Sequence, residues 1–139
     1  MIASILPLAT ALEKTGAIDL VTDAIVESSG LTSPLMLLLL LFAFTSLLSQ
    51  AISNTATSLL VAPLAIDLAQ RLDVSPYPLL MGIALAASTS FSTPMASPIN
   101  SLVIGAGGYR FIDFLKVGVP LQLLVLAATL IIVPILFPF

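Results

Sequence analysis

The sequence predicts an all-α integral membrane protein, because it is far more apolar than a soluble domain of its length. Of its 139 residues, 59% are hydrophobic and 8% are charged, with a mean hydropathy of +1.21, whereas roughly 25% of the residues in a soluble domain are charged. Three intervals, 28–66, 74–109 and 117–139, contain no charge, and each reaches the ~20 residues that a helix needs to cross a bilayer. We therefore expect a re-entrant helical hairpin, a discontinuous transmembrane helix and a final transmembrane helix, with the lipid bilayer around them.

Composition also excludes several classes of chemistry. The chain contains no cysteine and no histidine, so it offers no thiol nucleophile, imidazole base or Cys/His zinc site. Its net charge of −3 provides no basic surface for nucleic acid. We therefore expect that the protein is not an enzyme, does not bind nucleic acid and has no organic cofactor.

The N-terminal part predicts two short helical segments. Residues 1–12 are apolar but too few to span a bilayer, which is typical of the end of a helix that begins upstream. Asp19, Asp23 and Glu27 recur every four positions among apolar residues. This spacing predicts a helix that lies in the membrane interface over about residues 17–29.

The first charge-free interval predicts a helical hairpin over about residues 34–71. It opens with a serine N-cap followed by proline, a typical helix start. Helices over 35–52 and 56–71 would be about 27 and 24 Å long at about 1.5 Å per residue, joined at the cap- and turn-forming residues 53–55.

A single bent helix that crosses the membrane once is the alternative to the hairpin. We favour the hairpin because it returns Arg71 and Asp73 to the side on which Asp23 and Glu27 lie. Asp67 could be a coupling carboxylate, but four residues before Arg71 it is more simply one half of an i,i+4 ion pair near the surface.

Two dense clusters of uncharged polar residues lie inside the charge-free intervals. Nine of the fourteen residues 45–58 and eight of the fourteen residues 88–101 carry a hydroxyl or amide. Unsatisfied polar groups are costly in hydrocarbon, so these clusters predict a lined cavity or an ion site. Some of the hydroxyls are expected only to bond to helix carbonyls or to join neighbouring helices, namely Thr45, Ser46, Ser49, Ser88 and Thr89.

The second charge-free interval predicts a broken helix over about residues 77–105. Pro94 and Pro98 remove backbone donors and disfavour helical geometry in the residues before them, so the helix should break near 92–97 and restart at Pro98 with Ser97 as its cap. Unwound backbone exposes carbonyl oxygens to a small cation, and restarted helices present N–H groups to an anion.

The remaining residues predict a turn and the last span. The glycine-rich residues 105–110 lack the lysine and preceding strand of a phosphate loop, so we expect a turn there. A short amphipathic stretch at 111–116 precedes the final span over about 117–138. Arg110 and Lys116 place their loop in the cytoplasm by the positive-inside rule, which puts the C-terminus outside.

Four motifs together resemble the divalent anion:sodium symporter family, and most closely its bacterial permeases. They are the Ser-Asn-Thr tripeptide at 53–55, the proline-rich segment 93–100, the Gly-Gly-Tyr-Arg to Val-Pro segment 107–120, and residues 8–16. Members of that family have two inverted repeats, and this chain matches the second, C-terminal repeat. The resemblance implies a location in the bacterial inner membrane and two partners, the missing first repeat and a second copy in a homodimer.

The resemblance also implies the site residues and the coupling ion. In the family, the hairpin tip and the unwound stretch provide one sodium site and half of the anion site. Substrate binding then falls on Ser53, Asn54, Thr55, Ser97 and Pro98. Binding of Na⁺ falls on Ser53, Asn54, Ala96 and Ser97, with Asn100 as a further candidate. The family commonly has two prolines before the asparagine, whereas Ile99 separates Pro98 from Asn100 here, so the resemblance does not determine the local backbone at that point.

Two classes of function follow. The first is secondary active transport of a small divalent anion, sulfate or a dicarboxylate, coupled to Na⁺ within a larger transporter. The second is a truncated membrane fragment or scaffold that moves no solute unless a partner supplies the other repeat. Within the transport class, half of an arsenite or Na⁺/H⁺ antiporter of the same superfamily is the rival, and it would need a buried, unpaired acidic residue.

Overall fold

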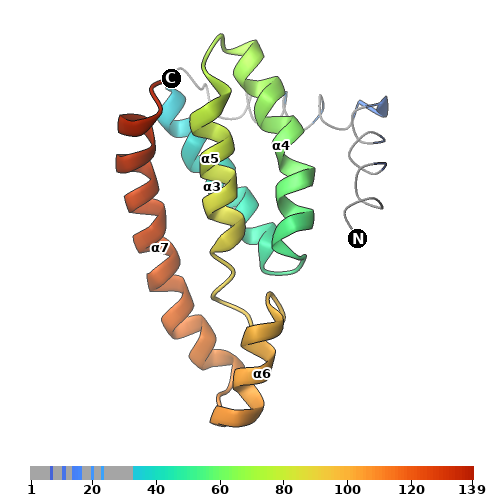
Figure 1. Ribbon diagram of the computed structural model, residues 1–139, viewed down its shortest axis with the longest axis vertical. Coiled ribbons are helices and arrows are strands. Elements are labelled where there is room, and N and C mark those ends of the chain that lie inside the picture. The colour runs from blue at the N-terminus through green and yellow to red at the C-terminus, as the bar shows by residue number, and fades with distance from the viewer. Residues whose placement is uncertain (1–6, 8–10, 12–13, 17–19, 21–22, 24–32) are drawn as a thin grey trace.

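The computed structural model describes residues 33–139 together with residues 7, 11, 14–16, 20 and 23. The segments expected at 1–12 and 17–29 therefore lie largely outside the described residues. Between residues 33 and 139 the chain forms five helices and no strand (Figure 1). They are α3 (Pro34–Ser49), α4 (Asn54–Arg71), α5 (Pro76–Ser88), α6 (Pro98–Gly107) and α7 (Phe111–Leu136).

Helices α3 and α4 form a hairpin, which rules out the single bent helix. The turn occupies residues 50–53, slightly earlier than the expected 53–55, because Ser53 is the N-cap of α4. The backbone of Ser53 is extended, and its hydroxyl accepts a hydrogen bond from the Ala56 N–H at 3.4 Å. Asn54 and Thr55 therefore begin α4 instead of joining the two helices.

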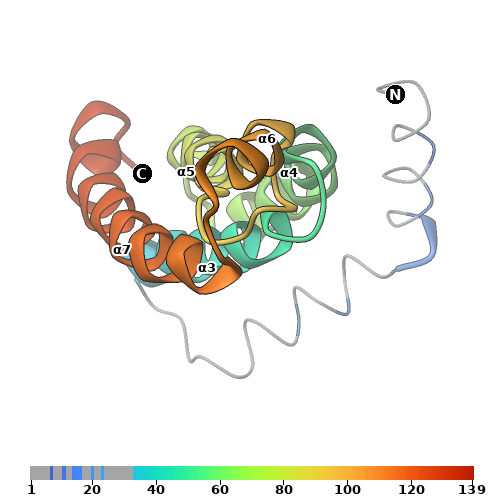
Figure 2. The same ribbon diagram turned by 90° about the horizontal axis from the view of Figure 1, so that it is seen from below.

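Helix α5 packs against both arms of the hairpin (Figure 2). A small residue allows the close approach, since a Cβ at Gly82 would lie 2.4 Å from the Leu38 side chain. The apolar core of the three helices is fully or almost fully buried and includes Leu37, Leu38, Leu41, Val61, Leu64, Ala65, Leu68, Leu79 and Ile83. This core fixes the end of α5 beside the hairpin turn.

The chain then loses helical structure over residues 89–97 before α6 begins. Ser97 is the N-cap of α6 and Pro98 is its first residue, as the two prolines indicated. Helix α5 ends at Ser88, earlier than the expected break near 92–97. The reason is that the Thr89 carbonyl accepts from the Phe91 N–H at 2.9 Å and from the Gln50 side chain, so it is bonded outside a helical ladder.

A tight turn connects α6 to α7. Gly108 adopts the left-handed conformation, with φ of 63°, and ends α6. The Arg110 N–H donates to the Asp113 carboxylate at 2.8 Å and so caps the start of α7. The stretch 111–116 and the span 117–138 were expected as separate segments, but α7 is a single helix of 26 residues, about 39 Å long at about 1.5 Å per residue. Pro120 lies inside this helix without ending it.

Helix α7 runs back along α3 and α5 and leaves most of its surface exposed (Figure 1). In the described part of the chain it is the helix that is long and apolar enough to cross a membrane by length and composition. Helices α3, α5 and α6 are also apolar but shorter. The interruption at 89–97 and the hairpin turn lie at the same level of the bundle, partway along α7 (Figure 1).

Candidate functional site

The hairpin tip presents the start of α4 and the end of α3 together. Ser53 and Thr55 are exposed, whereas Asn54 is partly buried. The Asn54 side-chain oxygen accepts a hydrogen bond from the Ser49 hydroxyl at 3.2 Å. The tip is therefore braced from inside by Ser49, while its two outer hydroxyl residues face away from the core.

Hydrogen bonds of Ser49 and Gln50 join the hairpin to the end of α5 and the unwound segment. The Ser49 hydroxyl donates to the Ala87 carbonyl at 2.7 Å. The Gln50 side-chain amide donates to the Thr89 carbonyl at 3.3 Å, and the Thr93 hydroxyl donates to the Gln50 carbonyl at 2.9 Å. The two motifs that the sequence singled out, far apart along the chain, thus form one polar site.

The unwound segment is held in shape by side chains from α6. The Asn100 amide donates to the carbonyls of Ser90 and Thr93, both at 3.0 Å. The Ser101 hydroxyl donates to the Pro94 carbonyl at 2.8 Å. Asn100, expected as a candidate Na⁺ ligand, therefore supports the backbone of the site through its amide nitrogen.

The start of α6 carries the other residues that the sequence singled out. The Ser97 hydroxyl accepts from the Ile99 N–H at 3.3 Å and so caps the helix. Ala96 is buried, with 7% of its surface exposed, whereas Pro98 is exposed. Ile99, the residue that interrupts the family's paired prolines, lies in the first turn of α6 and does not disturb the helix start.

The hydroxyls expected to have packing roles have them. Thr45 donates to the Leu41 carbonyl at 2.6 Å and Ser88 to the Ala84 carbonyl at 2.9 Å, both within their own helices. Thr89 donates to the Ala86 carbonyl at 2.7 Å, and Ser46 and Thr89 lie 3.3 Å apart across the α3–α5 contact. These bonds account for Thr45, Ser46, Ser88 and Thr89 among the polar residues of the two clusters.

Gln122 belongs to the same polar site, and the sequence analysis missed it. It is an amide on α7, and its oxygen accepts from the Ser92 hydroxyl at 2.9 Å. Its nitrogen donates to the Ser46 hydroxyl. The available signal was a single amide in the otherwise almost wholly apolar interval 117–139.

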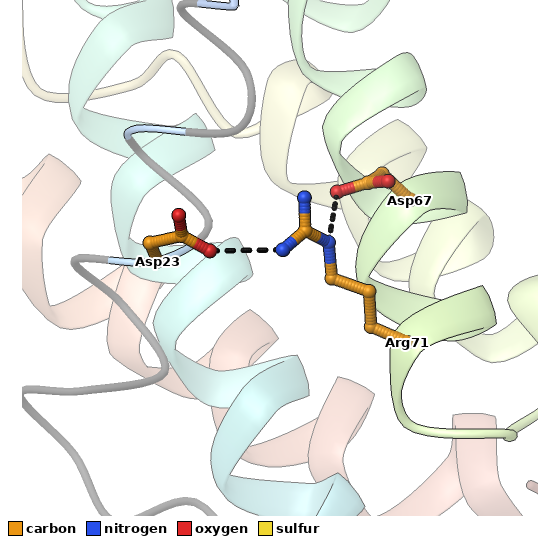
Figure 3. A network of polar contacts seen from close by, with 3 residues as sticks. All are labelled: Asp23, Asp67 and Arg71. Atoms are coloured by element: carbon orange, nitrogen blue, oxygen red, sulfur yellow. Dashed lines mark hydrogen bonds and ion pairs between the residues drawn. The ribbon is translucent and has the colours of Figure 1, made fainter.

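Asp67 is paired, as expected, and lies at the far end of α4 from the tip. Arg71 donates to Asp67 through Nε and to Asp23 through Nη1, both at 2.8 Å (Figure 3). The bond between Arg71 and Asp23 also joins the end of α4 far from the tip to a carboxylate that we expected on the same side as Arg71. Asp67 is thus a surface ion-pair partner in this structure.

The electrostatics of the site come from neutral groups. Among the described residues, no group of three His, Cys, Asp or Glu side chains could hold a metal ion. Two buried side-chain oxygen atoms have no hydrogen-bond partner among the described residues, Gln50 Oε1 and Thr57 Oγ1. Any cation held here would be coordinated by hydroxyl, amide and backbone carbonyl oxygens.

A cavity of about 330 Å³ opens beside the unwound segment, between α6 and α7. Its lining is mainly apolar and aromatic, with Asn100 and Asp113 among its polar groups. Phe91 of the unwound segment and Gly118 of α7 also line it. The cavity therefore adjoins the polar site on the side of α6 and α7.

Comparisons with known proteins identify relatives of the whole chain. Residues 1–138 match the family model described as citrate transporter. The uncharacterized transporter YfbS of Escherichia coli (strain K12) is 44% identical over 139 residues, 100% of this chain and 23% of that protein. The uncharacterized transporter sll0640 of Synechocystis sp. is 36% identical over 137 residues, 99% of this chain and 22% of that protein.

A relative with a more specific description is also similar. The sodium-dependent dicarboxylate transporter SdcS of Staphylococcus saprophyticus is 30% identical over 106 residues, 76% of this chain and 20% of that protein. The chain thus spans less than a quarter of the length of each of these three relatives.

Proposed function

This chain belongs to the citrate transporter family, and we propose that it forms an ion- and anion-binding part of a Na⁺-coupled secondary transporter. The family and the relatives are transporters, not enzymes, in agreement with the resemblance to the divalent anion:sodium symporters. The substrate that we propose is a divalent anion of the sulfate or dicarboxylate class. Because the chain spans less than a quarter of the length of each of these three relatives, transport is proposed for the longer protein.

The observation that carries this proposal is the hydrogen-bonded contact between the hairpin tip and the unwound segment. It brings the C-terminal end of α3 beside the C-terminal end of α5, through Ser49 to Ala87 and Gln50 to Thr89. Helix C-termini carry partial negative charge, and unwound carbonyls at such ends coordinate Na⁺ in transporters with broken helices. The proposed Na⁺ ligands are Ser53, Asn54, Ala96 and Ser97, with Asn100 as a further candidate.

The donor set fits Na⁺. The polar groups that meet here are uncharged, and the unpartnered side-chain atom at the hairpin turn, Gln50 Oε1, is an oxygen. A monovalent hard cation suits neutral oxygens, whereas a protein site for a divalent cation usually includes carboxylates. Na⁺ would contribute a positive charge beside the tip, and oxygens of Asn54 and of the unwound backbone would coordinate it.

The anion site is proposed for the starts of α4 and α6. Ser53 and Ser97 cap these two helices, and both helices begin at the level of the interruption (Figure 1). Helix N-termini attract anions through their free N–H groups and dipoles. With Asn54, Thr55 and Pro98, they complete the proposed substrate-binding set.

The membrane arrangement is part of the same proposal. Relatives in a transporter family are membrane proteins, and α7 is suited to cross the bilayer. We propose a multi-pass protein of the bacterial inner membrane, with Arg110 and Lys116 in the cytoplasm and Phe139 outside. The remaining repeat of the longer protein would cover the tip and the unwound segment, and two complete copies would form a homodimer.

The antiporter alternative receives less support from the structure. Proton exchange needs a buried titratable group, and Asp67 is bonded to Arg71 near the surface. The fragment or scaffold alternative predicts that this chain moves no solute unless a partner supplies the other repeat.

One experiment tests the proposed anion transport and separates Na⁺ coupling from proton coupling. The complete transporter is reconstituted in vesicles, and uptake of labelled succinate, citrate and sulfate is measured with Na⁺ or choline outside, with and without a pH gradient. Steep dependence of uptake on external Na⁺ is expected. Equal uptake in choline under a pH gradient would indicate proton coupling instead, and no uptake of any anion would refute anion transport.

A further inference from the structure

Gln122 is the residue through which α7 reaches the candidate site. Between residues 117 and 136, the other polar side chain is Thr129, and its hydroxyl turns back to the Val125 carbonyl of the same helix at 2.7 Å. The Gln122 amide instead bonds to α3 and to the unwound segment. An uncompensated amide would be costly in an apolar span, so these bonds are the physical reason that glutamine is tolerated there.

The two ends of the Gln122 amide hold two different parts of the site. Its oxygen accepts from Ser92 in the unwound segment at 2.9 Å, and its nitrogen donates to Ser46 in the hairpin. The Gln50 amide at the hairpin turn lies 3.5 Å from the same oxygen. Because one planar group makes these contacts, the hairpin and the unwound segment cannot separate without breaking at least one of them.

The backbone of α7 supports the same segment one turn earlier. A Cβ at Gly118 would lie 2.6 Å from the Phe91 carbonyl and from the Ser92 Cα. Residues four apart share a face of a helix, so Gly118 and Gln122 face the unwound segment together. The glycine sets how closely α7 approaches, and the glutamine sets the position of Ser92 relative to Ser46.

We infer that Gln122 is a positioning residue, which holds the unwound segment against the hairpin and thereby sets the affinity of the site for Na⁺. The inference rests on the proposed function. Residues 89–97 have no helical ladder of their own, so side-chain contacts must fix the directions of their carbonyls. If these carbonyls bind Na⁺, removal of the Gln122 hydrogen bonds should weaken Na⁺ binding, although Gln122 itself does not contact the ion.

The test compares three variants of the complete transporter in vesicles. Gln122→Met keeps the length of the side chain and removes both hydrogen-bonding ends. We expect it to raise the Na⁺ concentration for half-maximal uptake about tenfold, the ratio equivalent to about 1.4 kcal/mol. Thr129→Val is the matched control on the same helix, and it should leave this concentration unchanged because its hydroxyl bonds only to Val125. Gln122→Glu should also weaken Na⁺ affinity while the carboxylate is charged, because it then has no donor. Its Na⁺ affinity should recover in part as the pH falls, because a protonated carboxyl again has one donor and one acceptor.

A second measurement covers the case in which a variant transports poorly. Na⁺ should raise the thermal unfolding temperature of the purified transporter, and the Gln122→Met variant should need about ten times more Na⁺ for the same rise. Suppose that wild-type uptake depends on Na⁺, but Gln122→Met needs the same Na⁺ concentration as wild type both for half-maximal uptake and for the rise in unfolding temperature. The inference is then wrong and the proposed function stands. If wild-type uptake is independent of Na⁺, both are wrong.

Discussion

The hydroxyl of Thr93 donates a hydrogen bond to the backbone carbonyl of Gln50 at 2.9 Å, although 43 residues separate them. Gln50 is the C-cap of α3, where backbone carbonyls lack partners within the helix. Thr93 lies in the unwound segment, directly before Pro94. The bond therefore gives an unpaired carbonyl at the hairpin tip a partner from the interrupted helix.

Replacing Thr93 by valine should weaken this contact. The change preserves shape but leaves a partly buried carbonyl without its partner, a loss of about 1–3 kcal/mol in the free energy of unfolding. We expect a lower thermal unfolding temperature and reduced uptake, whereas Thr93→Ser should stay close to wild type. Ser88→Ala is the control, since this exposed hydroxyl bonds only to the Ala84 carbonyl within α5. Equal stability of Thr93→Val and Ser88→Ala would show that the bond between Thr93 and Gln50 contributes little.

Replacing Gly118 by alanine should separate α7 from the unwound segment. The added methyl group would meet backbone atoms of Phe91 and Ser92 at 2.6 Å, and backbone cannot move aside as easily as a side chain. Overpacking of this kind costs about 1–3 kcal/mol, so we expect a clear fall in thermal stability. Gly105→Ala on α6 has open space around it and should be neutral or slightly stabilising. The stability ranking of the two variants checks the contact, and the reverse order would contradict it.

The interruption of the helix could be predicted in part because prolines act locally. A serine followed by proline favours a helix start, and the structure has that start at Ser97 and Pro98. The end of α5 at Ser88 could not be predicted, because residues 88–92 contain no local stop signal. The Thr89 carbonyl is bonded to Gln50 instead, and that contact exists only after the hairpin has packed against α5.

The candidate site shows the same division between local and tertiary signals. Ser53 and Asn54 were found from a tripeptide of capping residues, and the structure begins α4 there. Gln122 was missed because its partners Ser92 and Ser46 lie 30 and 76 residues away. Likewise, α7 was divided near residue 117 because Lys116 ends a charged stretch, although charge does not stop a helix.

The 139-residue chain by itself should associate with other copies in detergent. Large apolar side chains on α6 and α7 are exposed, including Leu102, Val117, Leu124 and Ile131, and the hairpin tip needs protein or a lined cavity around it at membrane depth. We expect light scattering to give masses above that of the monomer and liposomes to show no substrate-dependent Na⁺ flux. Co-expression with the part of the longer protein that precedes this segment should restore a defined species. A stable monomer that transports an anion unaided would contradict the proposal that this chain is one part of a transporter.

The most direct test of the proposed ion site is uptake by Asn54→Ala in the complete transporter. The Ser49 hydroxyl keeps its shorter bond to the Ala87 carbonyl, 2.7 Å against 3.2 Å to Asn54, so expression and thermal stability should remain close to wild type. Gln70→Ala removes an exposed amide from the other end of α4 and should transport normally. We predict that Asn54→Ala abolishes Na⁺-dependent uptake while the protein stays folded. Uptake at the wild-type rate with the wild-type Na⁺ dependence would show that the hairpin tip does not bind the ion.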